Sequence, residues 1–203
     1  MHCNSYQTGM SVNKVPPETF YVLPTAHSPN SRLPVVVYRN ALNNPSFESI
    51  CAAMQTKDWV EGGHWTIAKV EGAAVPHFHS NAHECYGVIR GTGHYLLGKS
   101  PIDPDVDSNG QPVGVKFTAN AGDVFIYPAG VTHFVTQTEG DYEISEFNSD
   151  EHPWDLNDAD KSVEGTNEDR KRCERVPIPE RDPLYGPGGP LPELWKAITA
   201  SWS

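Results

Sequence analysis

Three histidines and a glutamate fall within the stretch PHFHSNAHE, residues 76–84. Neither core packing nor surface exposure explains so dense a run, because histidine is not a preferred core residue and is not restricted to the surface. Imidazole and carboxylate groups bind transition metals, and they also act as acids and bases. The run therefore indicates a metal site or an acid–base site, with a chance cluster as the alternative.

Strand geometry predicts how these side chains meet. If residues 77–79 are extended, His77 and His79 point to the same side, because side chains alternate along a strand. Glu84 begins the next predicted strand after a short turn, so its carboxylate can return beside the two imidazoles. His133 follows a Pro-x-Gly turn and begins a further predicted strand. Together they form an N/O ligand set that suits Fe(II), Mn(II), Ni(II), Cu(II) or Zn(II).

Other polar residues near this run have less certain roles. His83 is adjacent to Glu84, so its ring should face away from the metal, which predicts a supporting or surface role. Tyr86 follows Glu84 by two residues and should share its face, so it is a candidate for acid–base catalysis or for ordinary barrel packing. His64 and His94 are weaker candidates for lining the site, and core packing is the simpler interpretation for both.

The elements that must position these residues are mostly short strands. Gly or Pro recurs between runs rich in Val, Ile, Tyr and Phe, which is typical of an all-β sandwich or barrel. We predict strands at residues 34–40, 64–71, 84–91, 93–98, 114–119, 123–129, 133–138 and 142–148.

Two helices are predicted beside these strands. The first covers residues 45–59, with Asn44 as its N-cap, and the second covers residues 191–202; each has an apolar stripe that should face the core. The segments 100–112 and 149–175 are predicted loops, because they are polar and lack sustained periodicity.

The domain organisation follows from these elements. We expect an N-terminal arm over residues 1–33, a barrel over 34–148 that includes the first helix, and an extension over 149–203 that packs on the barrel. A chain of 203 residues is long enough to bury one substantial core.

Composition excludes several classes of partner. A formal net charge of -11 disfavours nucleic acids and anionic membranes, which would repel most of the surface. The N-terminus has no apolar segment behind a basic start, and no window approaches a membrane span in length, so a cytoplasmic protein is expected. The 4 cysteines are scattered without a C-x-x-C pair, which predicts neither a disulfide framework nor a thiolate zinc site.

Two motifs together resemble those of the cupin superfamily. GAAVPHFHSNAHECYGVIRG, beginning at Gly72, resembles the first cupin motif, and GDVFIYPAGVTHFVTQ, beginning at Gly122, resembles the second. Their order and separation also match. Gly72 lies one residue closer to the first histidine than in the usual pattern, and Gln137 stands where Asn is common. Neither departure involves a predicted ligand.

A resemblance to the YjlB-like single-domain cupins extends over nearly the whole chain. It rests on HFHSNAHECYGVIRG, on the preceding KDWVEGGHW and on the terminal VPIPERDPLYGPGGPLPELW. The resemblance implies a cupin double-stranded β-helix, a jelly-roll barrel, in which His77, His79, Glu84 and His133 bind one divalent transition metal. It does not supply a reaction, so function must be argued from the site.

The predicted function is that of a metal-dependent enzyme acting on a small carboxylate, enol or phenolic substrate. Four protein ligands on an octahedral metal leave two positions for substrate oxygens or for dioxygen, which favours a dioxygenase-type oxidoreductase with Fe(II). Mn, Ni or Zn are the alternative metals. A decarboxylase or isomerase, and a non-catalytic small-molecule-binding cupin, are the alternative functions. A homodimer is also predicted, because the apolar strand 34–40 and the arm segment 18–24 could extend a partner's sheet.

Overall fold

The computed structural model describes residues 10–67, 75–149 and 154–202. Gly72 and the last four residues of the predicted strand 64–71 lie outside these ranges.

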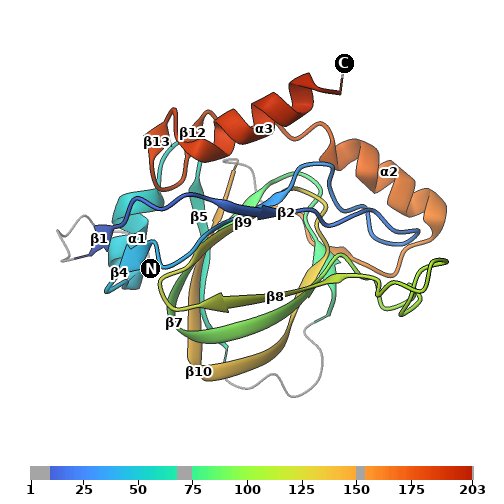
Figure 1. The fold of residues 1–203 in the computed structure, drawn as a ribbon, viewed down its shortest axis with the longest axis horizontal. Helices are drawn as coiled ribbons and strands as arrows, with labels where there is room; N and C mark the ends of the chain where they lie inside the picture. The colour runs from blue at the N-terminus through green and yellow to red at the C-terminus, as the bar shows by residue number, and fades with distance from the viewer. Residues whose placement is uncertain (1–9, 68–74, 150–153, 203) are drawn as a thin grey trace.

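Most strands belong to one antiparallel sheet that curls into a barrel (Figure 1). Its hydrogen-bonded order is β11 (Asn157–Asp158), β6 (His77–Phe78), β10 (His133–Asn148), β7 (Glu84–Leu97), β9 (Val124–Tyr127), β3 (Val35–Tyr38) and β2 (Glu18–Phe20). In addition, β5 (Val60–Ile67) pairs with β10 and β8 (Val115–Asn120) pairs with β7. Two small ribbons join β1 (Ser11–Val12) to β4 (Leu42–Asn43) and β12 (Arg181–Asp182) to β13 (Gly186–Pro187). This arrangement confirms the predicted jelly-roll barrel.

The sequence predicted two pairs of short strands where the structure has two long ones. The strands predicted at 84–91 and 93–98 form the single strand β7, and those at 133–138 and 142–148 form β10. Gly91 has a φ of 73° and lies against the other strand, where an added Cβ would approach the carbonyl oxygen of Glu139 to 2.5 Å. A glycine taken for a strand end is therefore a bend that allows a close approach.

The first helix is shorter than predicted. α1 spans Phe47–Met54 instead of 45–59, and its N-cap is Ser46 rather than Asn44. The Ser46 side chain accepts a hydrogen bond from the backbone N–H of Ser49, and the Ser49 hydroxyl donates to the Ser46 carbonyl. Asn44 instead adopts a φ of 50°, outside the helical region. The hydrogen bonds between Ser46 and Ser49 therefore begin the helix two residues later than the predicted N-cap at Asn44.

A second helix was missed. α2 spans Val163–Cys173, within the segment 149–175 that the sequence predicted to be a loop. It has little apolar periodicity, but Ser162 caps it, Glu164 lies in its first turn and Arg170, Lys171 and Arg172 lie in its last turn. These charges complement the helix dipole, which supports a helix without a wide apolar stripe. The third helix, α3, spans Pro190–Ala200 and confirms the predicted C-terminal helix within two residues at each end.

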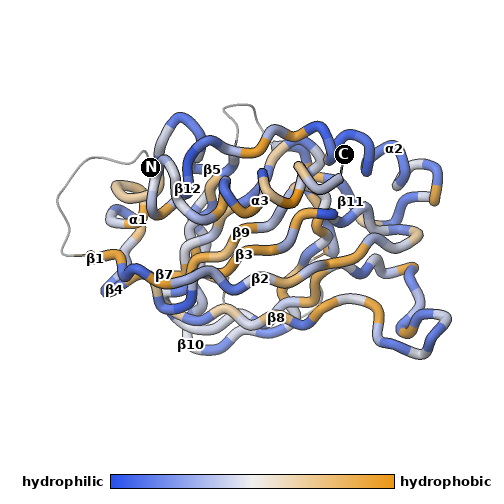
Figure 2. The backbone as a smooth tube through the Cα atoms, turned by 45° about the horizontal axis from the view of Figure 1, so that its top comes forward, coloured by the Kyte–Doolittle hydropathy of each residue, from blue (hydrophilic) through white to orange (hydrophobic). Residues whose placement is uncertain are grey.

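The core has two parts, on opposite faces of the sheet. Val35 and Val37 of β3 pack inside the barrel, whereas Val36 and Tyr38 face an outer cluster covered by α1 and α3. Trp195 of α3 is fully buried in that outer cluster. Figure 2 shows apolar strands in the barrel and a hydrophilic α2 at one end.

Two of the four cysteines are described as free thiols, Cys85 and Cys173, and both are buried. None of the helices in the described ranges is long and apolar enough to cross a membrane.

The predicted homodimer requires a strand at the edge of the sheet that is free to pair with a second chain. β3 pairs with both β2 and β9, so the 34–40 segment is not free to pair with another chain. β2 lies at the end of the strand order and is followed by the exposed side chains of Tyr21 and Leu23. We expect light scattering at micromolar concentration to give the mass of two chains, and the double variant Tyr21→Glu, Leu23→Glu to give that of one. A wild-type mass of one chain would contradict the prediction.

Candidate metal centre

The structure brings His77, His79 and His133 together at one end of the barrel. The potential ligand nitrogens of the three imidazoles lie within 4.8 Å of one another. His77 belongs to β6 and pairs directly with His133, the first residue of β10. The turn before β10 contains Gly130, whose N–H donates to the carbonyl of His79 at 2.8 Å. This turn therefore connects the two sequence motifs.

Gly130 is required at that turn for a steric reason. Its φ is 90°, which side-chain-bearing residues rarely adopt, and an added Cβ would lie 2.8 Å from the carbonyl oxygen of Asn30. The glycine of the second motif is thus explained by close packing of the backbone behind the site.

Each of the three imidazoles is oriented by a backbone carbonyl. Nδ1 of His77 lies 2.9 Å from the carbonyl oxygen of Val75, and Nδ1 of His133 lies 3.0 Å from that of Val131. Nδ1 of His79 contacts the carbonyl oxygen of Asp155. A carbonyl can only accept a hydrogen bond, so each Nδ1 carries a proton, and in the neutral ring each Nε2 is the nitrogen with the free lone pair. This is the tautomer that metal-binding histidines commonly adopt.

Glu84 completes the cluster from the first residue of β7. Its Oε1 lies 3.1 Å from Nε2 of His79, and its Oε2 lies 3.5 Å from Nε2 of His133. All three side chains are at least nine-tenths buried. Tyr86 donates its hydroxyl proton to Oε1 of Glu84 at 2.9 Å. The four residues predicted as ligands therefore lie together.

The contacts within the cluster require a cation. Carboxylate oxygens and deprotonated Nε2 atoms are all hydrogen-bond acceptors, so at 3.1 Å they repel one another unless a proton or a metal ion lies between them. Nε2 of His133 is buried and has no hydrogen-bond partner within residues 10–67, 75–149 and 154–202. Three imidazoles and one carboxylate suit a divalent transition metal, so the residues fit such an ion.

The pKa values of His133 and Glu84 are both shifted by their surroundings. Burial lowers the pKa of His133 to about 4, so its ring is uncharged at neutral pH. Burial acts to raise the pKa of Glu84, but the interactions with His79 and His133 and the hydrogen bond from Tyr86 outweigh it, so that pKa is lowered. Metal ligands must be deprotonated, and both groups meet that condition.

The segment after the barrel supports His79. The Asp155 carboxylate accepts hydrogen bonds from the backbone N–H and the hydroxyl of Ser80 and from the amide of Asn157, the last at 2.8 Å. Asn157 begins β11, which pairs with β6. The sequence did not identify this role, since these residues lie 75 or more positions from Ser80 and belong to no motif.

A cavity of about 280 Å³ opens beside the four residues. Its remaining lining is largely apolar or aromatic and comprises Trp65, Ile67, Tyr86, Tyr95, Phe134, Val135, Ile144, Glu146, Trp154 and Leu156. Such a lining would bury the body of a small organic ligand while the polar cluster binds its oxygen atoms.

Tyr86 lies in the cavity wall, as its predicted face requires. Its ring stacks on Phe125 with centroids 5.0 Å apart. Burial, and then the charge of Glu84, raise its pKa well above the usual value, so the hydroxyl stays protonated. The observed contact is with Glu84, which adds a positioning role to the predicted acid–base role.

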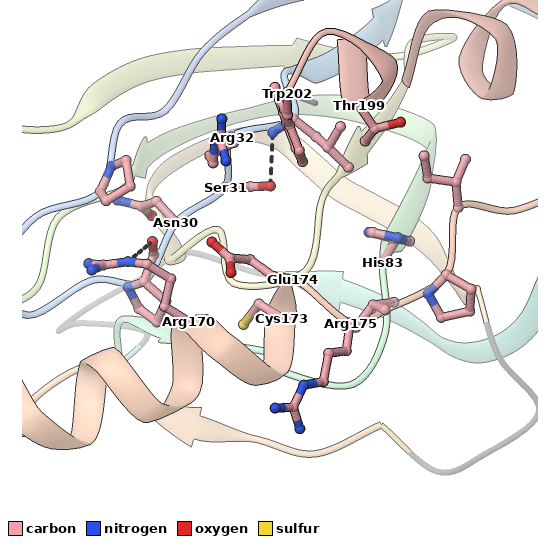
Figure 3. A pocket seen from close by; sticks show the side chains of 16 residues that line it. Asn30, Ser31, Arg32, His83, Arg170, Cys173, Glu174, Arg175, Thr199 and Trp202 are labelled. Atoms are coloured by element: carbon pink, nitrogen blue, oxygen red, sulfur yellow. Dashed lines mark hydrogen bonds between the residues drawn. The ribbon is translucent and has the colours of Figure 1, made fainter. Parts of the chain in front are cut away.

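His83 points to a different part of the molecule. It lines a separate cavity of about 400 Å³ beside the C-terminal ends of α2 and α3, as Figure 3 shows. Its Nδ1 accepts a hydrogen bond from the N–H of Ala129 at 2.9 Å, and its ring packs against Trp195. Burial lowers its pKa to about 4. This position agrees with a supporting role.

His64 and His94 do not line the cavity beside Glu84. His64 pairs with Glu143 at 2.6 Å and stacks on Phe47, and His94 pairs with Glu139 at 2.9 Å. Glu146, which does line that cavity, was missed. The alternation of β10 could have indicated it, because Glu146 shares its face with the apolar Ile144.

Comparison with known families agrees with this architecture. A family model described as Cupin matches residues 65–162, which contain all four clustered residues. This match, over just under half of the chain, agrees with the jelly-roll fold of the structure. No curated protein matches the chain.

Solved structures similar to this chain align with it only weakly. The 11S globulin from Wrightia tinctoria is 21% identical with a TM-score of 0.32, over 41% of this chain and 18% of the globulin. Vicilin from Corylus avellana (hazelnut) is 20% identical with a TM-score of 0.31, over 46% and 24% of the two chains. The match thus spans at most about a quarter of either seed protein.

One further structure aligns over more of its length. A dTDP-4-dehydrorhamnose 3,5-epimerase from Bacillus anthracis is 14% identical with a TM-score of 0.35, over 71% of this chain and 79% of the epimerase. TM-scores this low support no inference about activity.

Proposed function

We propose that the chain is a metal-dependent enzyme of the YjlB-like cupin type that oxidises a small organic molecule with dioxygen. The observation that carries the proposal is the convergence of three imidazoles and one carboxylate beside the cavity, with Glu84 lying 3.1 Å from Nε2 of His79 and 3.5 Å from Nε2 of His133. A divalent metal would be held by His77, His79, Glu84 and His133. When bound, it would supply Lewis-acid catalysis and, as Fe(II), the means to activate dioxygen.

The protein's own residues have separate roles in this proposal. The backbone carbonyls of Val75, Asp155 and Val131 fix the imidazole tautomers, and Tyr86 orients the Glu84 carboxylate. The apolar wall binds the body of the substrate and excludes water, which strengthens electrostatic interactions in the site.

A proton-transfer reaction, either decarboxylation or isomerisation, is the second candidate. It is favoured by Glu146, a buried carboxyl group in the cavity wall whose pKa is raised to about 9, first by burial. Such a group holds a proton at neutral pH and can act as a general acid. Decarboxylation and isomerisation require a proton donor of this kind, whereas in a reaction with dioxygen it would have only an accessory role.

Oxygen uptake separates these reactions. Tag-free protein loaded anaerobically with Fe(II) should consume dioxygen with at least one member of a panel of phenols, β-diketones and α-keto acids. Conversion of a panel member with Mn(II) and without oxygen uptake would favour the second candidate. No turnover with any metal would leave a small-molecule-binding protein as the better account.

Metal removal is expected to destabilise the fold. The four residues come from three strands and the turn after β6, so a bound ion connects segments that are distant in sequence and stabilises the native state by mass action. Thermal unfolding with excess chelator should begin several degrees lower than with one equivalent of metal. An unchanged transition after complete removal would show that the ion contributes nothing to stability.

Changing Tyr86 to Phe should weaken metal binding without unfolding the protein. The variant keeps the ring stacked on Phe125 but loses the hydrogen bond to Glu84. Loss of such a supporting contact typically lowers metal affinity or activity about 10- to 100-fold. Competition against a chromophoric chelator measures the affinity, and Tyr95→Phe, also in the cavity wall, is the matched control. Equal affinity in both variants would assign Tyr86 to packing.

A further inference from the structure

Glu146 is a buried carboxyl group that the four-residue cluster does not use. Its side chain is 2% exposed, and neither carboxyl oxygen has a hydrogen-bond partner among the residues that the structure describes. It lines the same cavity as the cluster and lies opposite Tyr86 in the pairing of β10 with β7. Burying a polar group without a hydrogen-bond partner costs folding free energy. We therefore expect a ligand that enters the cavity to form hydrogen bonds with this carboxyl group.

The neighbouring strand leaves space for this carboxyl group. A Cβ added to Gly62 would lie 2.1 Å from Oε2 of Glu146, and one added to Gly63 would lie 2.1 Å from the indole of Trp65. Glycine weakens a strand interior, so consecutive glycines in β5 have a stability cost. Here they allow the carboxyl group and the indole to pack closely against the strand.

The surroundings of Glu146 favour its neutral form. Burial is the main cause of its raised pKa, and the charges of Glu84 and Glu61 add to it. Tyr86, across the strand pair, is also protonated at neutral pH. Glu146 can therefore donate an O–H to a ligand oxygen, which an ionised carboxylate cannot do.

The lack of cationic side chains among the described residues of the cavity wall limits the charge of the ligand that it can bind. No Lys or Arg is among its lining residues in the described part of the chain. A second negative charge on the ligand would meet the carboxylate of Glu84 and an apolar wall, without a cationic side chain to offset its desolvation.

We propose that Glu146 is the hydrogen-bond donor that selects the ligand, a molecule with an apolar or aromatic body and a carbonyl, enol or phenol oxygen. Dicarboxylates and phosphorylated compounds are disfavoured. This inference rests on the proposed function, because the metal would bind the same oxygen-bearing end of the ligand.

The test compares two probes on Zn(II)-loaded protein by calorimetry. The probes are 2′-hydroxyacetophenone and phthalate, both benzene rings with adjacent oxygen groups, of which only phthalate is a dianion. Wild type should bind the first more tightly, because Glu84 and the apolar wall disfavour a dianion. Glu146→Met should bind 2′-hydroxyacetophenone about 10-fold more weakly than wild type, the size of one lost hydrogen bond to a buried group, Glu146→Gln should keep part of this affinity, and the exposed-site control Glu139→Gln should be unchanged. Equal affinity of Glu146→Met and wild type for this probe would overturn the inference.

Infrared spectroscopy of the metal-free protein at neutral pH provides the second readout. A C=O band of a protonated carboxyl group should be present in wild type and absent in Glu146→Gln. A missing band, or a wild-type preference for phthalate, overturns the inference while the proposed function stands. Wild type that takes up no Zn(II) would instead defeat the proposed function, and the ligand assignment would fail with it.

Discussion

Replacing His133 by Ala is expected to lower metal affinity by more than about 100-fold, beyond the loss that supporting residues alone cause. The variant removes the nitrogen that the second motif contributes and leaves His77, His79 and Glu84 as an incomplete set. Metal analysis of tag-free protein after dialysis against a weak chelator should show nearly empty protein. Wild type treated in the same way should retain about one equivalent.

His83→Ala is the matched control, because it also removes a buried imidazole. His83 lines a different cavity, so occupancy should stay near the wild-type value. Stability should fall by about 1–3 kcal/mol, since the N–H of Ala129 loses its acceptor. A metal-free His83 variant beside a loaded His133 variant would reverse the assignment of the two rings.

Changing Glu146 to Gln is expected to alter how stability depends on pH. In the metal-free folded protein the pKa of Glu146 is about 9, above its ordinary value of 4.5. The folded state therefore holds a proton that the unfolded chain releases. The associated stability is fully present below about pH 4.5 and is lost as pH rises through 9. Gln cannot ionise, so the variant lacks this loss.

Urea unfolding across this pH range measures the effect. Each pKa unit corresponds to about 1.4 kcal/mol, so the upper bound is on the order of 6 kcal/mol and at least about 2 kcal/mol should be measurable. The difference in free energy of unfolding, variant minus wild type, should increase between pH 5 and pH 9. A constant difference would mean that Glu146 is ionised in the folded protein. The orphaned amide of Gln adds only an offset that does not change with pH.

The sequence predicted the barrel and its polar cluster for a physical reason. Strand alternation places His77 and His79 on one face, and short turns return Glu84 and His133 to it, so local rules define most of the geometry. His83 was placed on the opposite side by the same parity. The continuity of β7 and β10 was not predicted, because a glycine at a bend has the same local signal as a glycine at a strand end.

The remaining features depend on contacts between distant segments. Asp155 orients His79 from 76 residues away, and β11 pairs with β6 through residues of no recognised motif. α2 is stabilised by its caps and charges, so apolar periodicity could not reveal it. Strand alternation places Glu146 on the same face as Ile144, but only the cavity shows that this buried carboxyl group lies beside the four-residue cluster.

X-ray absorption spectroscopy of the metal in tag-free protein tests the central claim most directly. The account predicts about one divalent ion per chain, a first shell of nitrogen and oxygen, and outer-shell scattering from three imidazoles. His77, His79 and His133 each carry their Nδ1 proton toward a carbonyl, so all three should bind through Nε2. Sulfur ligation, fewer than two imidazoles, or failure to retain any ion at stoichiometric loading would contradict it.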